Sequence, residues 1–210
     1  AFVLAQRSPS LAGPLHFEIP AGIATVTLER DDVVTGAMVD APKPFEELAE
    51  IPARDIARSV GLSSHDILVH VHQPVLAHVG NTYVFAQTTR EALARATPDI
   101  GVFREVRAAH EALHARYSLF LYALDDLPAP TAEARMFAPL VGTIEDPATG
   151  SAAAPLAALR LARSGATKLS LVVHQGRYVG RPSVLRAEAS RIADGIRARV
   201  GGSCVSVLRG

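Results

Sequence analysis

The stretch RMFAPLVGTIEDPATGSAAA, residues 135–154, decides the fold more than any other part of the chain. An apolar strand ends in two adjacent carboxylates, Glu145 and Asp146, and after a tight turn a helix starts at Gly150 and Ser151. The first amides of a helix have no intrahelical acceptor, and the helix dipole favours negative charge beside them. Gly150 admits a close approach to the backbone, and Ser151 adds a hydroxyl. This helix end therefore predicts a carboxylate or phosphate pocket, with Asp146 placed to bind a substrate or move a proton.

A purely structural interpretation fits the same residues. Thr149 or Ser151 would then cap the helix, and Asp146 with Pro147 would form a turn. On residue types alone both interpretations stay open. In either case the alanines at positions 152–154 indicate that the helix packs tightly inside surrounding strands.

Composition narrows the class of protein. The chain has 210 residues, and 49% of them are hydrophobic, which is enough for a folded core and excludes disorder. Its 21 basic and 21 acidic residues balance, so neither nucleic acid nor an anionic membrane is expected as a partner. A single cysteine, Cys204, excludes an internal disulfide and any site that needs two thiols. Without an apolar run long enough for a membrane helix, we expect a cytoplasmic protein.

Strands and helices alternate without a regular strand–helix–strand rhythm, which favours an α+β fold over a doubly wound sheet. Residues 1–7 have helical spacing but no start signal, so we expect a missing N-terminal segment. A Pro-rich loop is predicted at residues 125–130. Strands are predicted at residues 15–19, 22–29, 33–39, 67–71, 75–79, 81–87, 118–123, 134–139, 168–175, 183–189 and 204–208. Helices are predicted at residues 45–50, 53–60, 102–117 and 151–163, and from Thr89 to just before Pro98.

The segment from Glu145 to Ala152, preceded by residues 135–139, resembles the signature of the PhzF-like (phenazine biosynthesis) isomerase family. Further blocks in the same order support the resemblance along nearly the whole chain. They are Ala21-Gly22, residues 41–44, Gln175-Gly176, residues 180–183, and residues 200–202, which resemble the turn before the family's last strand.

The resemblance implies a diaminopimelate-epimerase-like fold. Such a fold has two pseudo-symmetric halves, each a curled mixed sheet around a central helix, with the active site between them. Residues 1–43 would be the remainder of the first half, with residues 1–7 the tail of its central helix. Residues 44–198 would form the second half around the helix 151–163, and residues 199–210 a closing strand that returns to the first half. Family analogy also implies a homodimer.

The resemblance also implies roles for individual residues. Asp146 would be catalytic, and Thr149, Gly150 and Ser151 would bind the substrate carboxylate, without any metal or cofactor. Asn81 resembles a pocket asparagine of the epimerase relatives and would bind substrate as well. The family's Gly-His-Pro-Thr-type block and its catalytic glutamate, which precede the first central helix, are not in this sequence.

The implied function is a cofactor-independent isomerase that transfers a proton at carbon, by a double-bond shift or an epimerisation, on a small carboxylate substrate. The alternative is a non-catalytic relative with an incomplete site that binds small anions or is structural. Racemases of this fold that use two cysteines are excluded, because Ala148 stands about where their second thiol would fall. Cys204 is expected to be a small buried apolar residue of the last strand.

Two histidine pairs have spacings that suit a metal ion. His70 and His72 lie two apart on a predicted strand, and His110 and His114 lie four apart on a predicted helix. Because no acidic or cysteine partner completes either set, we expect solvated histidines and no metal site.

Overall fold

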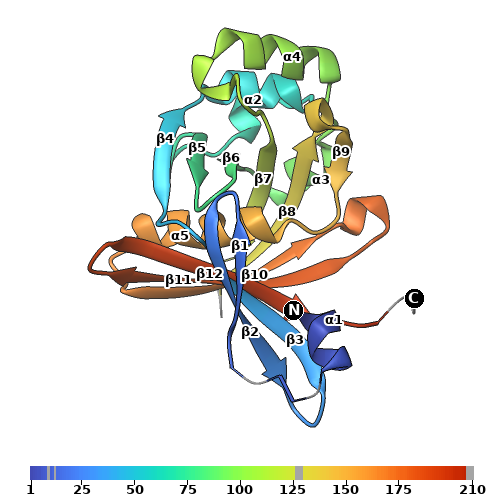
Figure 1. Ribbon diagram of the computed structural model, residues 1–210. Coiled ribbons are helices and arrows are strands. Elements are labelled where there is room, and N and C mark those ends of the chain that lie inside the picture. The colour runs from blue at the N-terminus through green and yellow to red at the C-terminus, as the bar shows by residue number, and fades with distance from the viewer. Residues whose placement is uncertain (9, 12, 126–129, 207–210) are drawn as a thin grey trace.

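An alanine-rich helix, α5 (Gly150–Ala162), lies inside a curled sheet at the centre of the fold (Figure 1). The computed structural model describes residues 1–8, 10–11, 13–125 and 130–206. Its other helices are α1 (Phe2–Arg7), α2 (Ala53–Ser59), α3 (Arg90–Arg95) and α4 (Ile100–Ala109). Its strands are β1 (Leu15–Ile19), β2 (Gly22–Arg30), β3 (Val34–Asp40), β4 (Glu46–Glu50), β5 (Val75–His78), β6 (Thr82–Gln87), β7 (Leu119–Asp125), β8 (Thr131–Ala138), β9 (Thr143–Asp146), β10 (Lys168–Gln175), β11 (Ser183–Ile192) and β12 (Gly195–Ser203).

The strands of the described residues form one continuous hydrogen-bonded path. Its order is β1-β2-β3-β12-β11-β10-β8-β7-β6-β5-β4, and β9 pairs with β8 beside this path. The pairs β8–β10 and β6–β7 are parallel, and the others are antiparallel. Strand β12 joins the two ends of the chain, because its residues 199–203 pair with residues 36–40 of β3. The α+β class and the curled sheet around a central helix are confirmed.

The core has two apolar layers, one on each face of the sheet. The inner layer surrounds α5, whose small side chains let β10, β11 and β12 approach it closely. The outer layer lies between the sheet and α2, α3 and α4. Successive strand residues alternate between the two layers, as Tyr83 and Phe85 face α5 whereas Val84 and Ala86 face the outer helices.

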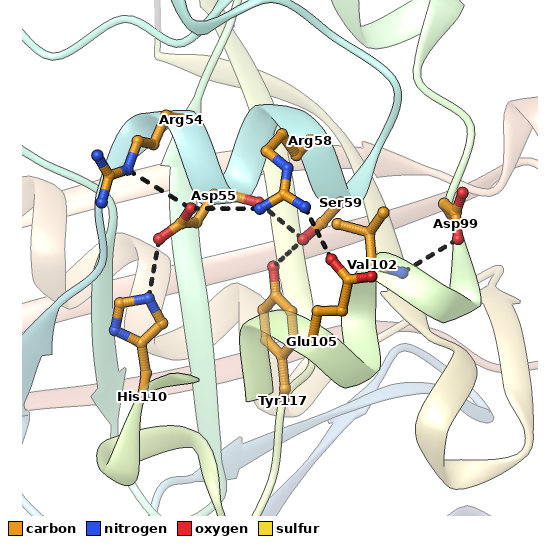
Figure 2. Close-up of polar contacts among 9 residues, drawn as sticks. All are labelled: Arg54, Asp55, Arg58, Ser59, Asp99, Val102, Glu105, His110 and Tyr117. Carbon is orange, nitrogen blue, oxygen red and sulfur yellow. Dashed lines mark hydrogen bonds and ion pairs between the residues drawn. The ribbon is translucent and has the colours of Figure 1, made fainter. Parts of the chain in front are cut away.

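Polar contacts link α2 to the residue after α4 and to the segment before β7 (Figure 2). The Asp55 carboxylate of α2 accepts a hydrogen bond from His110 Nε2 at 2.9 Å, just after α4 ends. The Tyr117 hydroxyl donates to Ser59 Oγ at 2.9 Å, which ties α2 to the segment before β7. His110 is therefore a half-buried structural partner of Asp55, and it is only partly solvated.

Several predicted elements differ from the observed ones. Residues 45–50 were predicted to be a helix, but residues 46–50 form β4, which pairs with β5. The helix predicted at residues 102–117 ends at Ala109 and is followed by a separate 3-10 turn at Glu111–Leu113. In the predicted strand 67–71, Ile67 alone forms a bridge, to Thr88.

The end of the chain also differs from the prediction. Residues 200–202 lie inside β12 rather than in a turn, because they pair with β3. The two strands are so close there that a side chain at Gly201 would collide with Met38 and with the Ala37 carbonyl. Cys204 follows β12 and is half-buried, with its amide donating to the Thr35 carbonyl at 2.9 Å. Of the predicted strand 204–208, residues 204–206 are not strand and residues 207–208 lie outside the described residues, as do residues 126–129 of the predicted Pro-rich loop.

No helix in the described part of the chain is long and apolar enough to cross a membrane.

Candidate active site

The N-terminus of α5 opens on a pocket of about 200 Å³. Parallel strands β6 and β7 begin beside it, whereas β8 and β9 end there, so the topology gathers residues that are far apart in sequence. The lining residues are Tyr83, Arg116, Met136, Ala138, Val141, Thr143, Asp146, Ala148, Thr149, Gly150 and Ser151.

Asp146 is the last residue of β9 and is half-buried at the pocket wall. Its Oδ2 accepts a hydrogen bond from the Thr149 hydroxyl at 2.7 Å. Thr149 occupies the N-cap position of α5, but its side chain makes no capping hydrogen bond. The Thr149 side chain thus orients Asp146 and leaves the first amides of α5 without a side-chain cap from this residue. The structure therefore does not bear out the interpretation of Thr149 as a simple capping residue.

Gln175, at the end of β10, fixes the loop between Asp146 and α5. Its Nε2 donates to the Asp146 carbonyl at 2.6 Å and to Thr149 Oγ1 at 3.0 Å, and its Oε1 accepts from the Thr149 amide at 3.1 Å. The side chain is 2% exposed, so these bonds form away from water and hold the loop strongly.

Gly176 lets this loop approach the end of β10. Its φ is +82°, in the left-handed region, and a Cβ there would lie 2.6 Å from the Pro147 carbonyl oxygen and even closer to the Arg181 carbonyl. Only glycine accommodates both the left-handed backbone angle and the close carbonyl oxygens.

Glu145, the other carboxylate of the motif, has a structural partner. It forms a buried ion pair with Arg135, with Oε2 at 2.7 Å from Nη2 and Oε1 at 3.0 Å from Nε. Arg135 Nη1 also donates to the carbonyls of Leu93 and Ala96 at the end of α3. The bidentate pair anchors β9 to β8 and α3 immediately before Asp146.

Ser151, the second residue of α5, contacts a residue of β6. Its hydroxyl lies 2.6 Å from the Tyr83 hydroxyl, and the Arg116 guanidinium lies 5.3 Å from the centre of the Tyr83 ring. Arg116 Nε donates to Ser118 Oγ at 3.1 Å, which fixes the arginine from behind. A cation, two hydroxyls and a helix N-terminus therefore share one wall.

The structure brings together four of the five predicted site residues: Asp146, Thr149, Gly150 and Ser151. Asn81 is exposed in the turn between β5 and β6 and does not line the pocket. Its role in substrate binding stays a prediction.

Three residues of the site were missed as contributors. Gln175 belongs to a block that carries the family resemblance, so a signal existed, although its bonds to the loop could not be foreseen. Tyr83 and Arg116 carry no local signal, because only the pairing of β6 with β7 places them beside α5.

The remaining candidates for metal or thiol chemistry lie elsewhere. The part of the chain that the structure describes holds no group of three or more His, Cys, Asp or Glu side chains suited to a metal ion. His72 is buried, with Nδ1 donating to the Gln73 carbonyl at 2.7 Å and Nε2 lying 2.5 Å from the Tyr122 hydroxyl. The expectation of a solvated side chain was therefore wrong for His72.

A curled sheet around a central helix is the class of α+β fold that this chain shares with structures described as a PhzF-family protein, a hydroxyproline epimerase and a probable proline racemase. The chain itself belongs to the phenazine biosynthesis-like (PhzC-PhzF) family, whose sequence model matches residues 1–210.

Individual relatives agree with this assignment. The chain is 30% identical over 202 residues to a trans-2,3-dihydro-3-hydroxyanthranilate isomerase of Pseudomonas chlororaphis, covering 93% of this chain and 66% of that protein. It therefore spans just under two thirds of that relative's length. A PhzF-family protein of Bacillus anthracis superposes with a TM-score of 0.75 at 21% identity, over 96% of this chain and 69% of that one. A Pseudomonas aeruginosa protein described as a predicted epimerase gives a TM-score of 0.71 at 28% identity, over 96% and 67%.

Proposed function

We propose that the pocket at the start of α5 is part of the active site of a cofactor-independent isomerase, which moves a proton at a carbon atom of a small carboxylate substrate. The observation that carries the proposal is that Asp146 and the N-terminus of α5 face the same pocket. The isomerase and epimerase names of the relatives support it.

The substrate carboxylate would rest near the amides of Gly150 and Ser151. These amides point out of the helix and carry its positive dipole end, so they attract an anion before the reaction. When a proton leaves the neighbouring carbon, negative charge spreads onto the carboxylate as an enolate. The same amides would then stabilise the charge that develops, without reorganising.

Asp146 would bind the reacting part of the substrate or protonate it. Thr149 engages Oδ2 and thereby orients the other carboxylate oxygen, Oδ1, for the substrate. A second carboxylic acid, implied by the family resemblance and not among the lining residues, would take the proton from carbon. Two acids in different surroundings suit this division, because their pKa values can be moved apart.

The test follows solvent deuterium into the substrate named for the relative, trans-2,3-dihydro-3-hydroxyanthranilate, by NMR in D2O. We expect exchange at carbon with the parent chain and a loss of at least about a hundredfold in Asp146→Asn, the usual lower bound for acid–base catalysis. Asp194→Asn, at an exposed turn, serves as the control. Unchanged exchange in Asp146→Asn would remove Asp146 from the mechanism. Binding without exchange in the parent would favour the anion-binding relative.

A further inference from the structure

We propose that Arg116 binds the substrate carboxylate, together with Ser151, and that the apolar lining residues receive the hydrocarbon part of the same substrate. The inference rests on the proposed function and names the class of substrate that the same site takes. It concerns a residue outside the sequence motif, brought to the pocket by strand pairing alone.

The first argument is that the charge of Arg116 is available. Arg116 makes no ion pair with any residue that the structure describes, although it lines the pocket. Its Nε is engaged by Ser118, and the Tyr83 ring supports its guanidinium plane. The two terminal nitrogens are left as a fork of donors, which matches a carboxylate in a bidentate arrangement. Arg135 differs, because Glu145 and two backbone carbonyls engage it.

The second argument is that Tyr83 couples the cation to the start of α5. Its ring lies under Arg116, and its hydroxyl meets the hydroxyl of Ser151. Tyr83 is 2% exposed, so its position is fixed by packing. With Tyr83 as the donor, Ser151 keeps its own proton for a substrate oxygen. One buried aromatic residue thereby holds Arg116 and Ser151 at a set spacing, as recognition of a single carboxylate requires.

The third argument concerns the apolar residues of the pocket lining, which lie beside its polar ones. Met136 and Ala138 at the end of β8, Val141 in the following turn and Ala148 before α5 contribute it. A ligand whose carboxylate meets Arg116 would place its body against these side chains and bury apolar surface there. The pocket therefore offers apolar surface to a ring or hydrocarbon body beside the carboxylate.

Calorimetric titration with two matched probes tests the inference. Anthranilate carries the carboxylate, and 2-aminobenzamide has the same ring and amine without the charge. We expect the parent chain to prefer anthranilate, and Arg116→Gln to weaken anthranilate binding about tenfold to a hundredfold while leaving the amide unchanged. Arg116→Lys keeps the charge without the fork and should retain part of the preference. Arg104→Gln, at an exposed arginine of α4 outside the pocket lining, is the control and should match the parent.

Four outcomes would overturn the inference. The parent chain could bind the acid and the amide equally or bind neither, Arg116→Gln could retain the preference, or Arg116→Gln could weaken both probes alike, as expected of a purely structural residue. The same two probes titrated into Asp146→Asn, the variant expected to lose exchange, test the carboxylate site separately from the proposed function. If the parent chain prefers the acid through Arg116 but catalyses no exchange, the carboxylate site is upheld and the isomerase is rejected.

Discussion

Replacing Gly176 by alanine should disturb the loop between Asp146 and α5 from outside the pocket. Gly180 provides a matched control at the other end of the same short turn. Both glycines have left-handed φ angles, +82° for Gly176 and +71° for Gly180. A Cβ at Gly180 would meet nothing within 4 Å, whereas one at Gly176 would meet two backbone carbonyls. Comparing the two alanine variants thus separates the loss of stability caused by the backbone angle from the loss caused by the close approach.

The magnitudes follow from these surroundings. Alanine in the left-handed region costs about 1–2 kcal/mol, and both variants carry this cost. At Gly176 the Pro147 carbonyl must also retreat by roughly 0.8 Å, from 2.6 Å to an ordinary contact of 3.4 Å. Overpacking of this kind costs about 1–3 kcal/mol more. Because Pro147 directly follows Asp146, the same shift moves the carboxylate, and a displacement near 1 Å can lower catalysis about a hundredfold.

Urea unfolding followed by circular dichroism measures the free energy of unfolding of both variants, and deuterium exchange measures their activity. We expect Gly176→Ala to be less stable than Gly180→Ala by about 1–3 kcal/mol and to lose most of its exchange activity. Equal losses of stability in the two variants would show that the loop does not approach β10 as described. An active Gly176→Ala of low stability would refute the link between this approach and Asp146.

Two further predictions concern buried polar side chains. Gln175→Met keeps the size of the side chain but leaves the Asp146 carbonyl and the Thr149 amide without their partner; it should lower the free energy of unfolding by about 2–4 kcal/mol in urea titrations. A loss below about 1 kcal/mol would contradict the anchoring role of Gln175. Burial, together with the arginine charges at the end of α5, lowers the pKa of His72 below its ordinary value of 6.5. The unfolded chain therefore binds the proton more readily, and stability should fall as the pH drops below 6.5. His72→Asn should lose this component of the pH dependence in unfolding titrations between about pH 7 and pH 5.

The exposed His70, two residues away, provides the matched substitution for the histidine prediction. If His70→Asn and His72→Asn changed the pH dependence equally, burial of His72 would not be its cause.

The sequence predicted elements whose local pattern and tertiary setting agree. The central helix and β10 were recognised within a residue of their bounds, because their apolar patterns match the layers that they enter. The prediction for β4 was wrong for the opposite reason. Its glutamates, leucine and alanine favour a helix in isolation, and only pairing with β5 makes the segment a strand. The turn expected at residues 200–202 came from the family resemblance, and the close packing of Gly201 against Met38, which belongs to a strand, is invisible locally.

The same distinction holds for the residues of the site: a local motif reveals some of them, and only the tertiary structure reveals the others. Asp146, Thr149, Gly150 and Ser151 are consecutive around one turn, so a single motif reveals them. Tyr83 lies in β6 and Arg116 in the segment before β7, both more than thirty residues before α5, so no spacing between them and α5 could be read from the chain.

The pairing of β12 with β3 also determines when the fold can be completed during synthesis. Strands β1 to β3 leave the ribosome before the other described strands, whereas β12, which joins them to the rest of the sheet, follows all of these strands. Until then β3 presents an unpaired edge, and β11 and β12 are not there to cover one side of α5. Such long-range contacts slow folding and leave apolar surface open to aggregation. The nascent chain should therefore depend on chaperone protection until residues 195–203 are released.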